Sequence, residues 1–273
     1  MTVLACTVEG VGFWAPGLPT WEAACAFARG GAIDADGPRK PSPRLLAANE
    51  RRRAPETVAV ALEVALAACQ ASGRDAASLP SVFASSQGDL VIADYMCATL
   101  ADDPATISPT RFHNSVHNAA AGYWTIGTGA MHPATALSAG DASFAQGLLE
   151  ALAQLAGGTE AVLLVGYDGA AVGPLGAVVR STGLLGGAMV LGRDPRPGAT
   201  VMQVRVVEAV RGGAAGPGPL ARHARGNASA PMLPLFDALA CGSPHASLDP
   251  GTGRSLEITL AEHQPMQGAA HES

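Results

Sequence analysis

The sequence predicts an α/β protein in which a mixed, mostly parallel sheet of five strands has helices on both faces. Short apolar runs of strand length alternate with longer segments whose apolar residues recur at helical spacing. This alternation is typical of right-handed β-α-β units, which cover both faces of a sheet with helices. Apolar residues make up 48% of the 273 residues, enough for a sizeable core.

The strands are predicted from short apolar runs bounded by turn residues. The predicted strands are 3–11, 81–85, 134–137, 160–165, 188–191, 201–210 and, as an edge strand, 255–260. The helices are predicted from helical spacing and from end signals, with Thr20 as an N-cap and Gly73 as a terminator. The predicted helices are 21–29, 56–72, 90–100, 115–128, 144–152 and 231–239.

The organised region is expected to form one domain over residues 1–211. Residues 30–53 within it hold many Gly, Pro and Arg and are predicted to be surface loop. Residues 212–273 are expected to be a loop-rich tail, with a short helix and an edge strand packing on the same domain. Residues 212–230, mostly Gly, Ala, Pro and Arg, are predicted to be a loop.

Charge and cysteine content narrow the function classes. A net charge of −6 without a basic cluster argues against binding nucleic acid. Charged residues make up only 15%, which hints at a buried partner surface. The five cysteines are odd in number and form no C-x-x-C pair, so they are expected to be reduced. With no signal peptide and no apolar run approaching ~20 residues, a cytoplasmic protein without a membrane span is expected.

One strand-turn-helix corner is the most informative feature. The apolar run 134–137 is followed by the small-residue turn Ser138-Ala139-Gly140-Asp141 and then by a helical pattern. Such a corner aims the first N–H groups of the helix at one point, which suits an anion, an oxyanion or a low-pKa thiolate. Enzymes that use this corner place a Cys or a Ser in it. This turn offers Ser138 and no Cys.

Four segments in order resemble the N-terminal half of a β-ketoacyl synthase, a member of the thiolase-like superfamily. They are the small-residue strand 82–86, the segment 109–122 with Asn-Ser-Val-His-Asn-Ala, the corner itself, and the Gly-x-Asp turn at 166–168. The Asn-Ser-Val-His-Asn-Ala segment is most similar to the small chain-length-factor-like proteins of aryl polyene pathways. The resemblance implies half of a thiolase-like fold and a β-ketoacyl synthase-like N-terminal domain over 1–211.

The same resemblance implies loss of condensing activity. It places Ala139 at the nucleophile position, with Ser138 there in a neighbouring alignment. The family's catalytic His, Lys and second His of the C-terminal half are not found, and the chain is about half the usual family length. Condensation needs a thiolate and polar donors for the enolate oxygen. The chain is therefore expected to be a non-catalytic partner of a ketosynthase, with no cofactor and an indirect relation to the acyl carrier protein.

Several residues are candidates for an acyl tunnel or a subunit interface. They are Tyr95, Met96, Thr99, His113, His117, Tyr123 and Ala136. Apolar members of this set are equally consistent with core packing, and the two histidines with interface hydrogen bonds. The histidines are not a predicted zinc pair, because no Glu or third ligand accompanies them.

Two other functions stay open. Ser138 in Ala-Leu-Ser-Ala-Gly resembles the hydrolase G-x-S-x-G elbow without its first Gly, so a Ser138-dependent hydrolase or acyltransferase is one alternative. An N-cap role for Ser138, with Asp141 complementing the helix dipole, is the favoured structural reading. A homodimeric binding protein that retains the fold is the other alternative. In the family, the strand before the corner pairs across a two-fold axis, so residues 133–137, with 119–122 beside them, are predicted to form a dimer interface with a ketosynthase or with a second copy.

Overall fold

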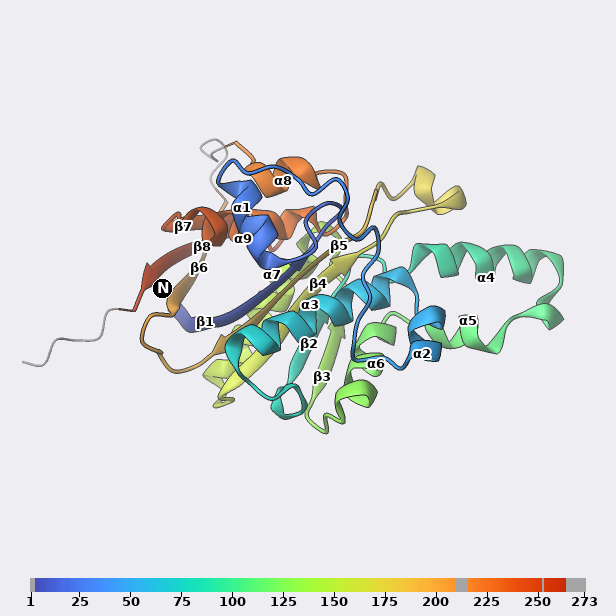
Figure 1. Cartoon of the computed structure of the whole chain (residues 1–273), viewed down its shortest axis with the longest axis horizontal. Helices are drawn as coiled ribbons and strands as arrows, with labels where there is room; N and C mark the ends of the chain where they lie inside the picture. The colour runs from blue at the N-terminus through green and yellow to red at the C-terminus, as the bar shows by residue number, and fades with distance from the viewer. Residues whose placement is uncertain (1–2, 210–215, 252, 264–273) are drawn as a thin grey trace, which may run out of the picture.

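One twisted sheet runs through the computed structural model, which describes residues 3–209, 216–251 and 253–263 (Figure 1). Its eight described strands lie in the order β3-β2-β4-β5-β1-β6-β8-β7. Their bounds are β1 (Val3–Trp14), β2 (Ser81–Ala84), β3 (Ala134–Leu137), β4 (Ala161–Asp168), β5 (Leu185–Gly192), β6 (Thr200–Glu208), β7 (His245–Leu248) and β8 (Arg254–Glu262).

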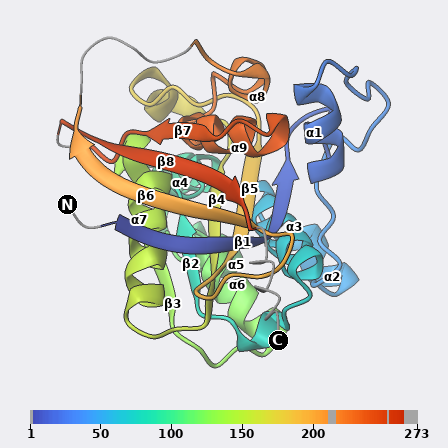
Figure 2. The same ribbon diagram turned by 90° about the vertical axis from the view of Figure 1, so that its left-hand side faces the viewer.

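The expected strand number of five is too low, because β6, β8 and β7 continue the sheet beyond β1 (Figure 2). Among the five strands β3, β2, β4, β5 and β1, the expected mostly parallel arrangement is present. Strands β3, β2, β4 and β1 run the same way, and β5 runs antiparallel between β4 and β1. The three added strands pair antiparallel, so most of the hydrogen-bonded pairs in the described sheet are antiparallel, contrary to the expected mostly parallel sheet.

Helices cover both faces, as predicted. Helices α3 (Glu56–Ser72) and α6 (Ala119–Thr128) pack on one face. Helix α7 (Ser143–Ala156) packs on the other face against β4, β2 and β1. The helical layer on that face also includes α1 (Trp21–Ala28), α8 (Pro219–His223) and α9 (Leu233–Cys241), which pack together (Figure 2). The core therefore has two parts, one on each side of the sheet.

The two central strands explain the strongest apolar runs in the sequence. Every residue of β4 and β5 is buried, because helices cover both faces there. Helix α3 lies close against β1, and the glycines of β1 allow this approach. A Cβ at Gly12 would stand 2.0 Å from the carbonyl oxygen of Val64 on α3. Gly10 and Gly12 of β1 therefore serve the close packing of the strand against α3.

The two helix ends predicted from Thr20 and Gly73 are confirmed. The Thr20 hydroxyl accepts a hydrogen bond from the Ala23 N–H, as expected of an N-cap. Gly73 ends α3 in the left-handed conformation, with φ of 69°. Helix α6 begins at Ala119 rather than at 115, because a turn separates it from α5 (Pro109–Asn114).

Several expectations for loops and edges need correction. The predicted loop 30–53 contains the short helix α2 (Ala48–Arg53), and the predicted loop 212–230 contains α8. Strand β8 is not an edge strand, since it lies between β6 and the unpredicted β7. Residues 210–215, 252 and 264–273, which include Val210 of a predicted strand and part of the predicted tail loop, lie outside the described residues.

A two-helix arm projects from the body of the molecule (Figure 1). It consists of α4 (Leu90–Asp102) and α5. Helix α4 packs mainly on α5 and on the short 3-10 helices η2 (Pro104–Thr106) and η4 (Gly173–Ala177). In the described part of the chain, no helix has the length and hydrophobicity needed to cross a membrane.

Candidate functional site: the corner at Ala139 and its surroundings

The corner forms where the sequence predicts it. Strand β3 ends at Leu137, the 3-10 helix η3 spans Gly140–Ala142, and α7 follows. Ser138, Ala139 and Gly140 are all exposed. The corner is therefore open to solvent or to a partner, and any chemistry in it depends on the groups that these residues present.

The backbone N–H of Ala139 is already occupied. It donates a hydrogen bond of 2.9 Å to the hydroxyl of Ser143, which is buried and itself donates to the Gly140 carbonyl at 2.6 Å. An oxyanion is stabilised by N–H groups that are free and aimed at it. The arrangement therefore removes one such donor from the corner, in addition to the missing thiol.

The Ser138 hydroxyl donates to the Ser86 carbonyl oxygen at 2.8 Å. Within the described residues, no hydrogen bond connects Ser138 to a His, Asp or Glu. The expected N-cap role is wrong: the cap positions are Ala139 for η3 and Ala142 for α7, and neither carries a side-chain cap bond. Asp141 lies in the first turn of η3 and is exposed, as a dipole-complementing carboxylate can be.

A buried carboxylate lies at the ends of β2 and β4, beneath the corner. Asp168 is 2% exposed and accepts four hydrogen bonds. Two come from the Ser85 and Ser229 hydroxyls, at 2.7 and 2.6 Å, and two from the backbone N–H groups of Ser86 and Gln87, at 3.0 and 3.3 Å. Burial raises the pKa of Asp168, and the four hydrogen bonds oppose that shift.

Asp168 and its four donor groups, on Ser85, Ser86, Gln87 and Ser229, form a hydrogen-bonded hub, the Asp168 hub. This hub connects the corner to the rest of the sheet. The Ser86 hydroxyl donates to the Gly140 carbonyl at 2.8 Å. The Ser85 carbonyl accepts a hydrogen bond from His117 Nε2 at 2.9 Å. From the tail, the Asn227 amide donates to the Asp168 carbonyl at 3.1 Å. The tail segment 227–229 thus supplies part of the hub, which the sequence analysis missed. The Gly-x-Asp turn was the signal that pointed to Asp168.

The candidate residues on α4 lie on the projecting arm. Tyr95, Met96 and Thr99 are all half-buried. The Tyr95 hydroxyl accepts from the Ser108 N–H at 3.3 Å, and the Arg111 guanidinium lies 3.9 Å from the Tyr95 ring centroid. The Thr99 hydroxyl donates to the Tyr95 carbonyl at 2.8 Å. These contacts hold the arm together and do not reach the corner.

The remaining candidates fall into three places. His113 is exposed on α5, with its ring centroid 6.2 Å from that of Tyr123 on α6. His117 lies in the turn between these helices and joins the Asp168 hub through Ser85. Ala136 lies in β3 opposite Phe83. The two histidines do not share a helix, and no metal-ligating cluster occurs among the described residues.

Exposed apolar side chains gather on the segments next to β3. Val116, Ile126 and Met131 are 48%, 80% and 94% exposed. Val116 and Ile126 line a cavity of about 360 Å³ together with His113 and Tyr123. Strand β3 pairs with β2 on one side, and in the described structure its other edge carries no strand. This end of the sheet therefore combines an open strand edge with apolar surface.

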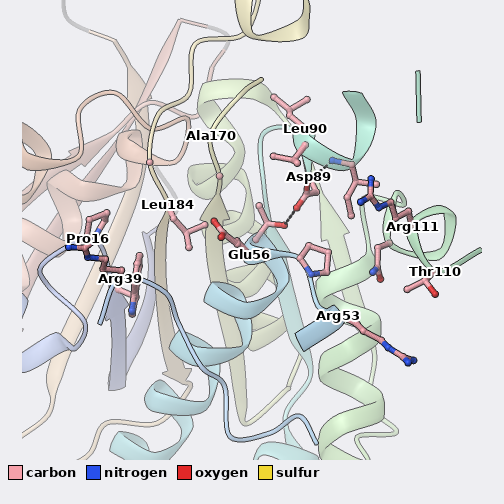
Figure 3. Close-up of a pocket in the computed structure, with 18 of the residues that line it drawn as sticks. Pro16, Arg39, Arg53, Glu56, Asp89, Leu90, Thr110, Arg111, Ala170 and Leu184 are labelled. Carbon is pink, nitrogen blue, oxygen red and sulfur yellow. Dashed lines mark hydrogen bonds between the residues drawn. The ribbon is translucent and has the colours of Figure 1, made fainter. Parts of the chain in front are cut away.

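A larger cavity of about 820 Å³ lies elsewhere, around the first turns of α3 and α4 (Figure 3). Its walls include Trp14, Asp89, Asn114 and Leu184, and none of the corner residues 138–141.

Comparison with solved structures shows the same fold. At TM-score 0.74 and 23% identity, the chain is similar to a chain of the complex of the ketosynthase ApeO with its chain length factor ApeC from Xenorhabdus doucetiae, covering 94% of this chain and 99% of that chain. A second match is the AntDE:AntF complex of a type II polyketide acyl-carrier protein with its ketosynthase, at TM-score 0.68 and 12% identity, covering 95% and 99%. A third is the ishigamide ketosynthase/chain length factor, at 0.58 and 16%, covering 74% and 67%.

The first two matched chains are covered almost completely, so the expectation that this chain is half the length of its relatives does not hold for these two. The comparison with curated proteins gives no match. The family model described as beta-ketoacyl synthase, N-terminal domain, matches residues 21–180, more than half of the chain. The chain belongs to the β-ketoacyl synthase N-terminal domain family.

Proposed function

We propose that this chain is a chain-length-factor-like subunit that pairs with a ketosynthase and does not itself condense. The observation that carries this proposal is the state of the corner. Ala139 offers no group that can be acylated, and its N–H is bonded to Ser143. Loss of one oxyanion donor costs about 10²–10³ in rate even where a nucleophile remains. A corner without the nucleophile and with this donor occupied is suited to a structural role.

The open edge of β3 supports the proposed pairing. An unpaired edge beside apolar surface invites association, and Ala134, Thr135 and Ala136 are small enough for a close approach. We assign this surface, with Val116, Ile126 and Met131, to the interface with the ketosynthase. The similar solved structures include ketosynthases recorded with chain length factors, which is the reason for choosing that occupant over a second copy.

The candidate tunnel residues belong to the same proposal. His113 and Tyr123 line the cavity next to the β3 surface, and Tyr95, Met96 and Thr99 lie on the arm formed by α4 and α5. In the assembled pair these side chains would border the space for the growing chain. The Asn-Ser-Val-His-Asn-Ala segment favours polyene-type elongation on an acyl carrier protein, a cytoplasmic process.

Co-expression tests the proposal. The chain is produced alone and with a ketosynthase from the same gene neighbourhood that has an intact Cys, and each sample is analysed by size exclusion with light scattering and by condensation assay. A stable one-to-one complex is expected, and the product length should depend on this chain. Failure of the two proteins to associate, or condensation by this chain alone, would count against the proposal.

A further inference from the structure

Two of the five cysteines lie on helices that pack against each other. Cys25 is in α1, and Cys241 is the last residue of α9 (Figure 2). Cys25 is half-buried and Cys241 is exposed, so neither thiol is enclosed in the core. The fold therefore brings together two accessible thiols that are far apart in sequence.

Contacts at both ends fix how α1 and α9 lie against each other. At their N-terminal ends, the ring centroids of Trp21 and Phe236 are 6.0 Å apart, in an edge-on arrangement. At their C-terminal ends, Arg29 Nε donates a hydrogen bond to the Ala240 carbonyl at 2.8 Å. Both helices advance in the same direction between these contacts. Cys25 therefore lies on the stretch of α1 that runs alongside α9.

The sulfur atom of Cys241 faces α1. Its Sγ lies 3.6 Å from the Ala28 carbonyl oxygen. Residues three apart in a helix are neighbours on one face, so Ala28 is adjacent to Cys25. Helical side chains also point toward the N-terminal end of their helix, which directs Cys241 back toward the level of Cys25. Burial raises the pKa of Cys25, and negative charge on Cys241 adds to this rise, as expected for neighbouring thiols.

The other three cysteines are placed differently. Cys6 and Cys69 are buried in the two separate parts of the core, and burial raises the pKa of each to about 12. Cys97 is exposed on α4, in the projecting arm. Cys97 therefore provides an internal comparison for an exposed thiol outside the α1–α9 contact.

We propose that Cys25 and Cys241 form a reversible disulfide when the protein meets a peroxide, and that this bond fastens α9 to α1. The exposed Cys241 thiolate attacks hydrogen peroxide, releases hydroxide and becomes a sulfenic acid. The Cys25 thiolate then attacks that sulfur and displaces a second hydroxide. The two thiol protons combine with the two hydroxides, so two thiols and one peroxide give one disulfide and two water molecules. A dithiol reductant reverses the reaction.

The bond would act on the part of the tail that supports the corner. Helix α9 follows the segment 227–229 after the single turn η5 (Ala230–Met232), and this segment includes Ser229 of the Asp168 hub. A crosslink between residues far apart in sequence stabilises a fold mainly by restricting the unfolded chain. The oxidised protein should therefore hold its tail more firmly than the reduced protein. This device is independent of the partner role and operates in the isolated chain.

Peroxide treatment followed by peptide mapping tests whether the bond forms. The purified chain is reduced, freed of reductant, exposed to dilute hydrogen peroxide and then blocked with a maleimide. Chymotrypsin, which cleaves after Trp21, separates Cys25 from Cys6. We expect a chain of monomer mass that has lost two hydrogen atoms, and a crosslinked pair of peptides that contain Cys25 and Cys241. Recovery of both cysteines as maleimide adducts, or a disulfide from Cys241 to another chain, would overturn the proposal.

Variants separate the crosslink from a general effect of oxidation. Oxidation should raise the thermal midpoint of the wild-type chain by about 5–10 °C, and dithiothreitol should reverse the rise. Cys25→Ser and Cys241→Ser should each abolish this rise, whereas Cys97→Ser, the matched control at an exposed thiol, should keep it. An unchanged midpoint in crosslinked wild type, or a rise that persists in Cys241→Ser, would contradict the role assigned to the bond.

Discussion

The Ser143 hydroxyl accepts the hydrogen bond of the Ala139 N–H at 2.9 Å. The residue at the expected nucleophile position therefore lacks a thiol, and its N–H is already engaged. A mutation can supply the missing thiol, but it does not by itself free the N–H. Restoring the thiol by mutation would leave the N–H bonded to Ser143, and it would not supply the downstream His and Lys that the family resemblance implies are missing.

We expect Ala139→Cys to leave the chain inactive in condensation. Purified wild type and variant are incubated with acyl- and malonyl-carrier protein, and both ketoacyl product and acylated protein mass are measured. Neither protein should give product, because the N–H of residue 139, a potential oxyanion donor, is bonded to Ser143. The partner ketosynthase with its own Cys is the positive control. Product from the variant alone would show that the corner needs only a thiol.

Ser138 should not react as a hydrolase nucleophile. Its hydroxyl donates to the Ser86 carbonyl and has no described base as hydrogen-bond partner. A fluorophosphonate probe should therefore leave Ser138 unlabelled, as judged by mass spectrometry of the peptide that contains it. Ser138→Ala should cost about 0.5–1.5 kcal/mol in unfolding free energy for the lost hydrogen bond. Labelling of Ser138 that disappears in Ser138→Ala would revive the hydrolase alternative.

Asp168 should be a main determinant of stability at the ends of β2 and β4. Asp168→Ala removes the acceptor of four hydrogen bonds and leaves buried donors without partners. A loss of about 3 kcal/mol or more in the free energy of unfolding is expected. Urea denaturation measures it, and Asp141→Ala, which removes an exposed carboxylate, is the control. Equal stability of the two variants would mean that the hub contributes little.

The same residue should give a pH dependence of known sign. Burial raises the pKa of Asp168, so the folded state holds this proton more tightly than the unfolded state does. The free energy of unfolding should therefore fall as the pH rises from about 4, the ordinary pKa of Asp, through the folded pKa. Asp168→Asn should lose this component of the slope, and Asp141→Asn should keep it. The comparison is made by urea denaturation between about pH 4 and pH 7, and an unchanged slope in Asp168→Asn would contradict the assignment.

Thiol reactivity should separate four of the five cysteines into two groups. Burial raises the pKa of Cys6 and of Cys69 to about 12, whereas Cys97 and Cys241 are exposed. A thiolate is the reactive form, so Cys6 and Cys69 should react with a maleimide only after denaturation. Peptide mapping after labelling at pH 7.5 identifies the sites. Rapid native labelling of Cys69 would show that α3 opens readily.

The sequence predicted those parts of the fold that local signals determine. Helix Glu56–Ser72 was located correctly because Gly73 and a long apolar pattern define it. Strand β7 was missed because its four residues have only one buried side chain, Leu248, and owe their conformation to pairing with β8.

In the candidate site too, features formed by residues adjacent in sequence were predicted, whereas those formed by residues far apart in sequence were not. The corner was found because a strand, a turn and a helix follow one another in sequence. The Asp168 hub was missed because Ser85 and Ser229 are 83 and 61 residues away from it. The bond between Ala139 and Ser143 spans four residues, yet it depends on a turn geometry that no sequence pattern specifies.

The last prediction concerns the free edge of β3. Ala136→Asp places a charge in the strand that we assign to the interface, where an unpaired buried carboxylate is costly. Wild type is expected to be a dimer, alone or with a ketosynthase, and to bury more than roughly 2,000 Å² in total. The variant should be monomeric or insoluble. Ser247→Asp places the same charge on β7, at the opposite end of the sheet, and should leave the dimer intact. Light scattering at micromolar concentration decides between these outcomes. A stable wild-type monomer that tolerates Ala136→Asp, and that still fails to bind a ketosynthase, would remove the physical support for the proposed partner role.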